Sequence, residues 1–264
     1  MKRADKAGHN VLMEKYFTVN SDGCSIGCKI YADDISAVRK AVLFGHGFSG
    51  NRDNKAAEKL AKHLTDKNRG AALVIFDWPC HGSDVRKTLR LEDCEKYLDI
   101  MLSYVKGAFP QAELYGSATS FGGYLYLKHI SEKGNPFKKA ALRCPAVVMY
   151  EVITQTIADE GDMKRLAKGK PVEVGFDSKV RIDARFVESL RMNDLTARDL
   201  RAFSDDILMI HGTEDEIVPF DAVKEFAERN GIELDAVEGA DHKFRDPAKM
   251  DRVIKRMAEY FGMK

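Results

Sequence analysis

The sequence has almost no excess of charge and no long apolar run. Its formal net charge is +1, and its 42 basic and 41 acidic residues are interspersed along the chain. A chain without a basic patch has no electrostatic means of holding nucleic acid or an anionic membrane surface. No apolar stretch approaches the roughly 20 residues of a membrane-spanning helix. We therefore expect neither nucleic acid nor a membrane as a partner.

Cysteine is also scarce, and its count is odd. The five cysteines lack the C-x-x-C spacing of zinc or redox sites. They are Cys24, Cys28, Cys80, Cys94 and Cys144. Such a set predicts reduced, mostly buried thiols, as in cytoplasmic proteins. The first residues, MKRADKAGHN, are followed by no apolar stretch long enough for a signal peptide, which also favours a cytoplasmic location.

Apolar runs of strand length recur along the chain and predict a parallel sheet. They cover residues 41–44, 71–76, 112–116, 139–143, 207–210 and 233–237. Continuous apolarity is typical of strands buried on both faces, and segments of helical period lie between the runs. Two alternating runs around Ser21-Asp22-Gly23 predict an antiparallel hairpin ahead of them. The chain is therefore expected to form one α/β domain over 1–264, a mostly parallel, doubly wound sheet with its ligand site at the carboxyl ends of the strands.

The alternation of strands and helices is interrupted over residues 146–202. The pattern here predicts a helix over 151–167, a hairpin with arms 171–177 and 179–186, and a short helix over 188–192. Because the segment lies between two core strands, we interpret it as a cap insertion that folds over the strand ends. Its acidic and basic residues nearly balance, so it indicates no charged substrate.

The stretch GHGFSG, residues 45–50, has two interpretations. It fits the G-x-G-x-x-G spacing of a dinucleotide-binding loop, and the next apolar run ends in Asp77, where a ribose-binding acid is expected. The same backbone, beside a strand that carries a nucleophile, aims an N–H at a developing oxyanion. Asp77 lies 27 positions after Gly50 (77 minus 50), more than the usual interval of about 20. The oxyanion interpretation is favoured.

The stretch ATSFGG, residues 118–123, places a serine between a strand pattern and a helix pattern. Ser120 is thus at the kind of sharp turn that exposes a nucleophilic hydroxyl above a sheet. Small residues at 118 and 122 suit such a strained turn, although Ala118 replaces the first glycine of G-x-S-x-G. Ser117 is a rival that lacks the turn, and a helix-capping role is the alternative for Ser120.

An acid and a histidine follow later strands. Asp215 comes after the run 207–210, and His242 comes after the run 233–237. The order Ser120, Asp215, His242, with each residue at the end of a different strand, is that of a Ser-Asp-His triad on an α/β sheet.

Other acids and histidines nearby need an interpretation too. Glu214 and Glu216 compete with Asp215, and Asp241 is adjacent to His242, where it is badly placed to orient the ring. Three histidines each precede a glycine at a strand end; they are His46, His81 and His211. We expect these to hold loop backbones, since the spacing of a zinc protease is missing, and we expect no metal and no other cofactor.

These landmarks resemble the α/β-hydrolase superfamily. HGFSGN, FDWPCHGSD, ATSFGG, HGTEDEIVP and GADHKF occur in that family's order over about residues 15–262. The HGF loop and the short cap make the chain most similar to bacterial feruloyl (cinnamoyl) esterase-like enzymes. The resemblance implies Ser120 as the nucleophile, His242 as the base, Asp215 as its partner, and the amides of Phe48 and Phe121 as the oxyanion hole.

We therefore expect a serine hydrolase that cleaves carboxylic esters of small or aromatic acyl groups through an acyl-enzyme. A thioesterase or a small-peptide hydrolase would use the same triad, and a non-catalytic ligand-binding protein on this fold is a remote alternative. The expected partner is a small-molecule ester. The substrate-binding residues, the exact acyl and alcohol groups and the oligomeric state, a homodimer included, stay open.

Overall fold

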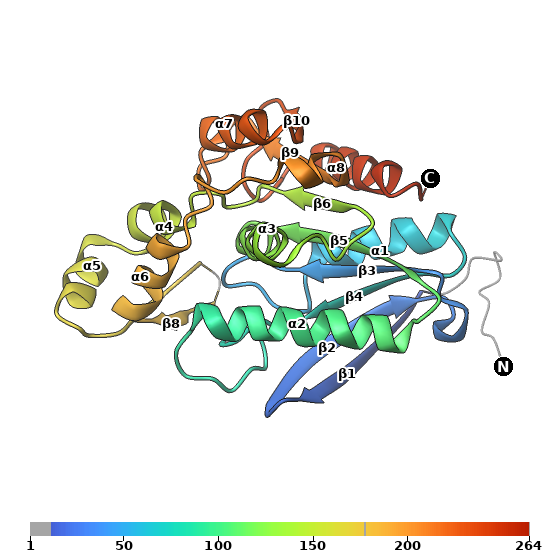
Figure 1. Ribbon diagram of the computed structural model, residues 1–264, viewed down its shortest axis with the longest axis horizontal. Coiled ribbons are helices and arrows are strands. Elements are labelled where there is room, and N and C mark those ends of the chain that lie inside the picture. The colour runs from blue at the N-terminus through green and yellow to red at the C-terminus, as the bar shows by residue number, and fades with distance from the viewer. Residues whose placement is uncertain (1–11, 177, 264) are drawn as a thin grey trace.

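The computed structural model describes residues 12–176 and 178–263 and is built around one large sheet (Figure 1). The strand order is β1-β2-β4-β3-β5-β6-β9-β10. The strands are β1 (Met13–Ser21), β2 (Cys24–Ala32), β3 (Lys40–Gly45), β4 (Ala71–Phe76), β5 (Glu113–Thr119), β6 (Ala140–Arg143), β9 (Ile207–Gly212) and β10 (Glu233–Val237). β2 is antiparallel to both β1 and β4, and the other neighbours are parallel. The predicted α/β fold, with its antiparallel hairpin at the start, is confirmed.

Helices cover both faces of the sheet (Figure 1). They are α1 (Lys55–Lys67) and α8 (Pro247–Tyr260) on one face, and α2 (Leu91–Ala108), α3 (Phe121–Lys133) and α7 (Phe220–Asn230) on the other, with a short η1 (Ile35–Ala37) before β3. The five α-helices all bury apolar side chains; in α1, for example, Leu60 and Leu64 are each 1% exposed. Burying one such side chain stabilises the fold by about 1.5–3 kcal/mol. Among the described residues, no helix is both long and apolar enough to cross a membrane.

Between β6 and β9 the chain leaves the sheet and forms a group of short elements. These are α4 (Met149–Glu151), η2 (Val152–Ile157), α5 (Glu160–Ala167), β7 (Val172–Val174), β8 (Val180–Ile182), α6 (Ala184–Met192) and η3 (Arg201–Asp206). β7 and β8 pair antiparallel, so the predicted hairpin is confirmed, but its second arm is shorter than the expected 179–186 because α6 begins at Ala184. Asp177 at its turn is outside the described residues. Figure 1 shows α4, α5, α6 and β8 beyond the ends toward which β3, β5 and β6 point.

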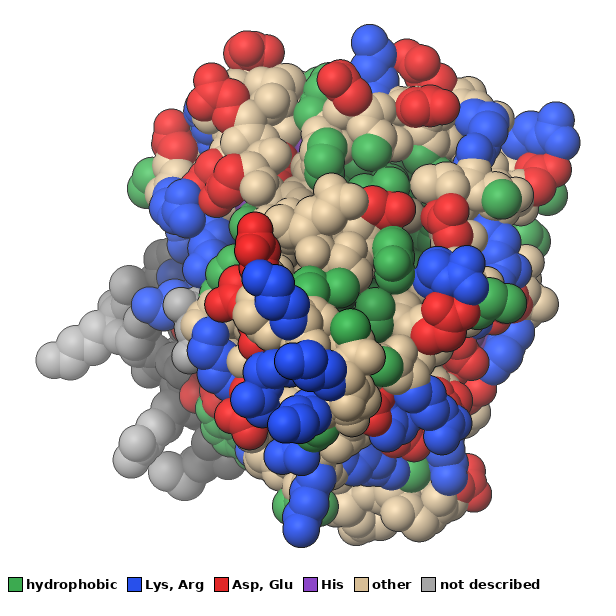
Figure 2. Space-filling model, turned by 90° about the vertical axis from the view of Figure 1, so that its left-hand side faces the viewer, with side chains coloured by type: hydrophobic (Ala, Val, Ile, Leu, Met, Phe, Trp, Pro, Cys, Tyr) green, Lys and Arg blue, Asp and Glu red, His purple; other side chains and the backbone are tan. Residues whose placement is uncertain are grey.

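This end of the molecule faces the viewer in Figure 2. Side chains of both charge signs lie on it, and Lys and Arg side chains gather in the lower part of the view. The surface is therefore mixed, as expected for a chain with a net charge of +1.

Two details of the predicted elements are wrong. The expected single helix over 151–167 is broken, because η2 is a π-helix that ends at Ile157, Ala158 is extended, and α5 then begins with its own cap. Asp159 accepts a hydrogen bond from the N–H of Asp162, and the Asp162 carboxylate accepts one from the N–H of Asp159. Such a reciprocal pair starts a new helix.

The expected burial of every parallel strand on both faces is also wrong for β10. This strand is the last of the sheet, and most of its residues are partly exposed. Asp235 and Glu233 pair with Arg252 and Arg256 of α8. The stretch MKRADKAGHN, on which the expectation about a signal peptide rests, lies outside the described residues.

Candidate active site

Ser120 lies at the turn between β5 and α3 in a strained backbone conformation. Its φ is 52° and its ψ is −117°, and a positive φ is uncommon for any residue with a Cβ. Two backbone hydrogen bonds hold the turn: the Ser120 N–H donates to the carbonyl of Arg143 (3.0 Å), and the Ser120 carbonyl accepts from the N–H of Tyr124 (3.0 Å). The serine therefore lies above the carboxyl end of β5, where its hydroxyl faces a cavity.

The small residues around Ser120 are explained by the close approach of β3. A Cβ at Gly122 would lie 2.4 Å from the carbonyl oxygen of Gly45, so only glycine fits. Ala118 pairs with Gly45 across the sheet, and a Cβ on Gly45 would lie 3.4 Å from that of Ala118. Alanine replaces the first glycine of the usual motif without a clash because the residue that faces it is itself a glycine.

Asp215 and His242, on the loops after β9 and β10, are hydrogen-bonded to each other. His242 Nδ1 is 2.8 Å from Asp215 Oδ2 and 3.0 Å from Oδ1. The N–H groups of Ile217 and Val218 also donate to Oδ1 of Asp215, and His211 Nε2 lies 3.2 Å from Oδ2.

The Asp215 carboxylate stays ionised despite its position. Its side chain is 0% exposed, and burial acts to raise its pKa. Hydrogen bonds from His211 and His242 outweigh that effect and hold the pKa of Asp215 well below its usual range. An ionised carboxylate at Nδ1 keeps the proton of neutral His242 on that nitrogen and leaves Nε2 as the proton acceptor.

The acids that compete with Asp215 in the sequence lie elsewhere. Glu214 is exposed. Glu216 accepts a hydrogen bond from the backbone N–H of His242 (3.1 Å), and Asp241 pairs with Arg245 (2.6 Å). Of these four acids, only Asp215 contacts the imidazole of His242.

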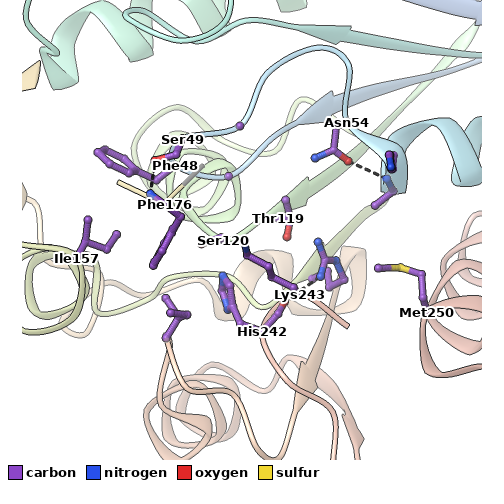
Figure 3. A pocket seen from close by; sticks show the side chains of 16 residues that line it. Phe48, Ser49, Asn54, Thr119, Ser120, Ile157, Phe176, His242, Lys243 and Met250 are labelled. Carbon is purple, nitrogen blue, oxygen red and sulfur yellow. Dashed lines mark hydrogen bonds between the residues drawn. The ribbon is translucent and has the colours of Figure 1, made fainter. Parts of the chain in front are cut away.

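Ser120 and His242 line one cavity of about 400 Å³ (Figure 3). Figure 3 places Phe176 and Ile157 on one side of it and Met250 on the other. Between these two described residues, Ser120 and His242, the structure contains no hydrogen bond, and such bonds often tighten only when substrate binds. The remaining lining residues are Gly47, Phe48, Ser49, Gly50, Asn54, Lys55, Ala56, Thr119, Arg143, Ile217 and Lys243.

The loop over residues 45–50 runs beside the Ser120 turn. A Cβ on Gly47 would lie 3.3 Å from the Cβ of Ser120, so the loop backbone passes directly over the serine. The rings of Phe48 and Phe121 pack edge to face with their centroids 5.8 Å apart. The segments that carry the two expected oxyanion donors therefore meet at Ser120.

The dinucleotide interpretation of this loop does not suit the structure. Asp77 is 1% exposed and accepts hydrogen bonds from the backbone and guanidinium of Arg52 and from the backbone and hydroxyl of Ser83. The next helix, α1, begins at Lys55 and not at the last glycine of the motif. Asp77 binds the protein's own loops, and the glycines serve the approach of β3 to Ser120.

The histidines that precede glycines are buried and hold loop backbones. His46 Nε2 accepts from the N–H of Trp78 (3.3 Å), and His81 Nδ1 lies 2.8 Å from the carbonyl of Pro79. Burial lowers the pKa of His46 to about 4, and burial together with the nearby His46 lowers the pKa of His81 to about 3. Both rings are therefore uncharged at neutral pH.

One group of side chains offers atoms of the kind that bind metals. Ligand atoms of Cys144, His211 and Asp215 lie within 4.8 Å of one another. Burial raises the pKa of the Cys144 thiol well above its usual value, and His211 Nε2 already contacts the carbonyl of Val218 (2.9 Å). A protonated thiol is a poor metal ligand, so these three residues form a hydrogen-bonding cluster behind His242.

The cysteines are unpaired throughout the described part of the chain, and all but Cys80 are buried. Burial raises the pKa of Cys28 and of Cys80 to about 12. The prediction that the thiols are mostly buried is confirmed.

Most residues of the cavity wall, Phe176 and Arg143 among them, were not identified from the sequence. Phe176, 41% exposed, comes from the turn between β7 and β8, and its N–H donates to the hydroxyl of Ser49 (3.3 Å). No sequence pattern indicated that contact, since it depends on how the segment folds back. Arg143 had a signal: it is a charged residue at the end of a buried apolar run.

The comparisons with known proteins concern the family and the fold of the chain. Residues 67–264 match the model of the prolyl oligopeptidase family. No curated protein sequence matches the chain.

Similar solved structures share the fold at low sequence identity. Est1E from Butyrivibrio proteoclasticus with ferulic acid bound is 17% identical with a TM-score of 0.74, over 93% of this chain and 99% of that one. A putative hydrolase from Agrobacterium vitis S4 is 18% identical with a TM-score of 0.72, over 95% and 99%. A soluble variant of monoglyceride lipase from Saccharomyces cerevisiae in complex with a substrate analog is 15% identical with a TM-score of 0.73, over 96% of each chain.

Proposed function

The chain belongs to the prolyl oligopeptidase family and has an α/β-hydrolase fold, and from this premise we propose that it is a serine hydrolase that cleaves carboxylic esters. The observation that carries the proposal is the arrangement of three side chains around one cavity. Ser120 on its strained turn and His242, oriented by a buried and ionised Asp215, line the same cavity. This arrangement can activate a hydroxyl for attack on a carbonyl carbon.

In the proposed mechanism, His242 Nε2 takes the proton of Ser120 as Oγ attacks the ester carbonyl. Asp215 stabilises the resulting imidazolium, and the amides of Phe48 and Phe121 stabilise the tetrahedral oxyanion. The alcohol leaves with the proton from His242, which gives an acyl-enzyme. His242 then takes a proton from water as the water attacks the acyl carbon, and it returns this proton to Ser120 Oγ as the acid is released.

The walls of the cavity support an acyl group that is small or aromatic. Apolar side chains of Phe48, Ile157, Phe176, Ile217 and Met250 line a space of about 400 Å³, which is within the usual size of small-molecule sites. The fold neighbour Est1E has been solved with ferulic acid, an aromatic acid. The proposal includes two further points. Residues 146–202 act as a cap over the site, since Ile157 and Phe176 come from this segment. The protein is located in the cytoplasm, in keeping with its unpaired cysteines.

Hydrolysis of a small peptide or another amide is a second candidate. It is favoured by the match to the prolyl oligopeptidase family over residues 67–264. The same three residues would serve, because the acyl-enzyme and its hydrolysis are alike for esters and amides.

The test is the hydrolysis of a chain-length series of p-nitrophenyl esters and of methyl ferulate, beside p-nitroanilides with matched acyl groups. We expect the wild type to turn over the esters and the Ser120→Ala variant to lose at least about 10³-fold in kcat. Faster turnover of anilides and peptides than of esters would favour the second candidate. Equal ester turnover by wild type and Ser120→Ala would contradict both.

A further inference from the structure

The described charged residues that line the cavity beside Ser120 have one sign. Apart from His242, they are Lys55, Arg143 and Lys243, and none of the described residues that line the cavity is acidic. The chain as a whole is close to neutral, so this one-sided set is a local feature. A cavity of this kind attracts anionic ligands.

Arg143 is the most unusual of these residues, because it is a buried cation. It ends β6 and is 8% exposed. Its Nη1 donates to the carbonyl of His242 (3.0 Å), and its guanidinium lies 5.5 Å from the centre of the Phe244 ring. In the described part of the chain no carboxylate lies within 4 Å of it, although Asp215 and Asp241 act on it from farther away.

A guanidinium has five N–H donors, and taking an unpaired cation out of water is strongly unfavourable. Proteins that retain such a group usually pair it with an anion. The described residues supply no carboxylate within 4 Å of Arg143, whereas Arg143 lines a cavity that a ligand can enter.

The surroundings of Arg143 suit an anion as well. Arg143 pairs with Thr119 in the register of β6 with β5, and both line the cavity next to Ser120. The first turn of α1 lines it too, through Lys55 and Ala56. The start of this 13-residue helix carries a partial positive charge. Figure 3 shows Asn54, the cap of α1, on the side of the cavity away from Ile157.

We propose that this cationic side of the cavity, formed by Arg143 and the start of α1, binds a carboxylate, so that the substrate is an ester carrying a carboxylate group. The inference rests on the proposed function for the cleavage step, but the anion site does not depend on it. A guanidinium can donate two parallel hydrogen bonds to a carboxylate. The charge balance of residues 146–202 gave no sign of a charged substrate, because the cations come from β6 and α1.

The inference is tested with pairs of esters that differ only in a carboxylate. Mono-p-nitrophenyl adipate is compared with p-nitrophenyl hexanoate for a carboxylate on the acyl side. 4-(Butanoyloxy)benzoate is compared with phenyl butanoate for a carboxylate on the alcohol side. We expect the wild type to prefer the charged member of at least one pair in kcat/KM, and the pair that shows it tells which part of the substrate contacts Arg143.

The readout for Arg143 is the ratio of kcat/KM within a pair. In Arg143→Gln this ratio is expected to fall about 10- to 100-fold, the range for loss of a hydrogen bond to a charged group, while Arg143→Lys retains part of it. Arg229→Gln, the same change on α7 at a residue outside the cavity, is the matched control and keeps the wild-type ratio. If Arg143 only supports the His242 carbonyl, Arg143→Gln slows both members of a pair equally and the ratio stays constant, which would overturn the inference. A wild type that prefers the charged ester in neither pair would overturn it too.

A binding measurement separates this inference from the proposed function. Ser120→Ala is titrated calorimetrically with dicarboxylates from succinate to suberate and with phthalate, and then with their neutral diamides. Binding of a dicarboxylate that weakens at least tenfold in Ser120→Ala/Arg143→Gln supports the carboxylate site even if no ester is cleaved. Ester cleavage without such binding and without a preference for the charged esters would support the proposed hydrolase function but contradict the carboxylate site.

Discussion

Mild acid should destabilise this protein through two histidines that are buried without charge. His46 is 0% exposed and His81 is 3% exposed. Their rings lie 5.4 Å apart beneath the loop that passes Ser120. Burial lowers the pKa of His46 to about 4, and burial together with His46 lowers the pKa of His81 to about 3.

The size of the effect follows from these pKa values. An unfolded histidine titrates near 6.5, so above that pH both states are neutral and the stabilisation is complete. As the pH falls below about 6.5, the two histidines of the unfolded chain bind protons. In the folded chain His46 binds a proton only near pH 4 and His81 only near pH 3, so the folded state loses stability relative to the unfolded state. At pH 5 each histidine lowers the free energy of unfolding by roughly 1.5 × 1.36, or about 2 kcal/mol, and the pair by about 4 kcal/mol. That is a large share of the 5–15 kcal/mol typical of a folded protein.

The assay is urea denaturation of the wild type and of His81→Asn at several pH values between about 7 and 5. The asparagine amide can still donate to the Pro79 carbonyl but does not titrate. We expect the wild type to lose about 2 kcal/mol more than the variant over this range. His129, whose pKa burial also lowers, titrates in both proteins and cancels in the comparison. A difference between the two proteins that is constant with pH would refute the reasoning.

Three further predictions concern the cavity. Gly47→Val pushes the loop away from Ser120, because even a Cβ at this position lies 3.3 Å from the Cβ of the serine. We expect kcat to fall about 10²- to 10³-fold in steady-state kinetics. An unchanged kcat would argue against a role of this loop in the oxyanion hole. Asp215→Asn removes the carboxylate that orients His242, and kcat is expected to fall about 10³- to 10⁴-fold in the same assay; a loss below tenfold would mean that another group orients the ring. Phe176→Ala removes an apolar wall but keeps the backbone, so KM for aromatic esters should rise several-fold with little change in kcat; a fall in kcat alone would contradict a purely binding role.

The strands and the Ser120 turn were predictable because the signals that define them are local. The run 71–76 is β4 from its first to its last residue, since a strand buried on both faces must be apolar at each position. ATSFGG marked the turn because its small residues reflect how closely β3 approaches. The pairing of His242 with Asp215 followed from placing both at strand ends, since parallel strands bring their carboxyl ends to one edge.

The cap and the charge of the cavity were harder to predict because they depend on contacts between distant segments. The helix expected over 151–167 looked continuous in its apolar period, and only the capping pair of Asp159 and Asp162 ends it. Phe176 reaches the cavity through a turn whose position depends on how 146–202 folds as a whole. Arg143 was visible in the sequence as a charge in an apolar run. That no carboxylate of the described residues lies close to it depends on the folded structure, which the local sequence does not reveal.

The central claim is that His242 activates Ser120 as a nucleophile, and labelling with a fluorophosphonate tests it most directly. The wild type and His242→Ala are treated with the reagent, and the adduct is located by intact mass and peptide mapping. The account predicts a single adduct on Ser120 in the wild type and greatly slowed labelling in the variant. An unlabelled Ser120 in the folded wild type, or equal labelling rates in the two proteins, would contradict it.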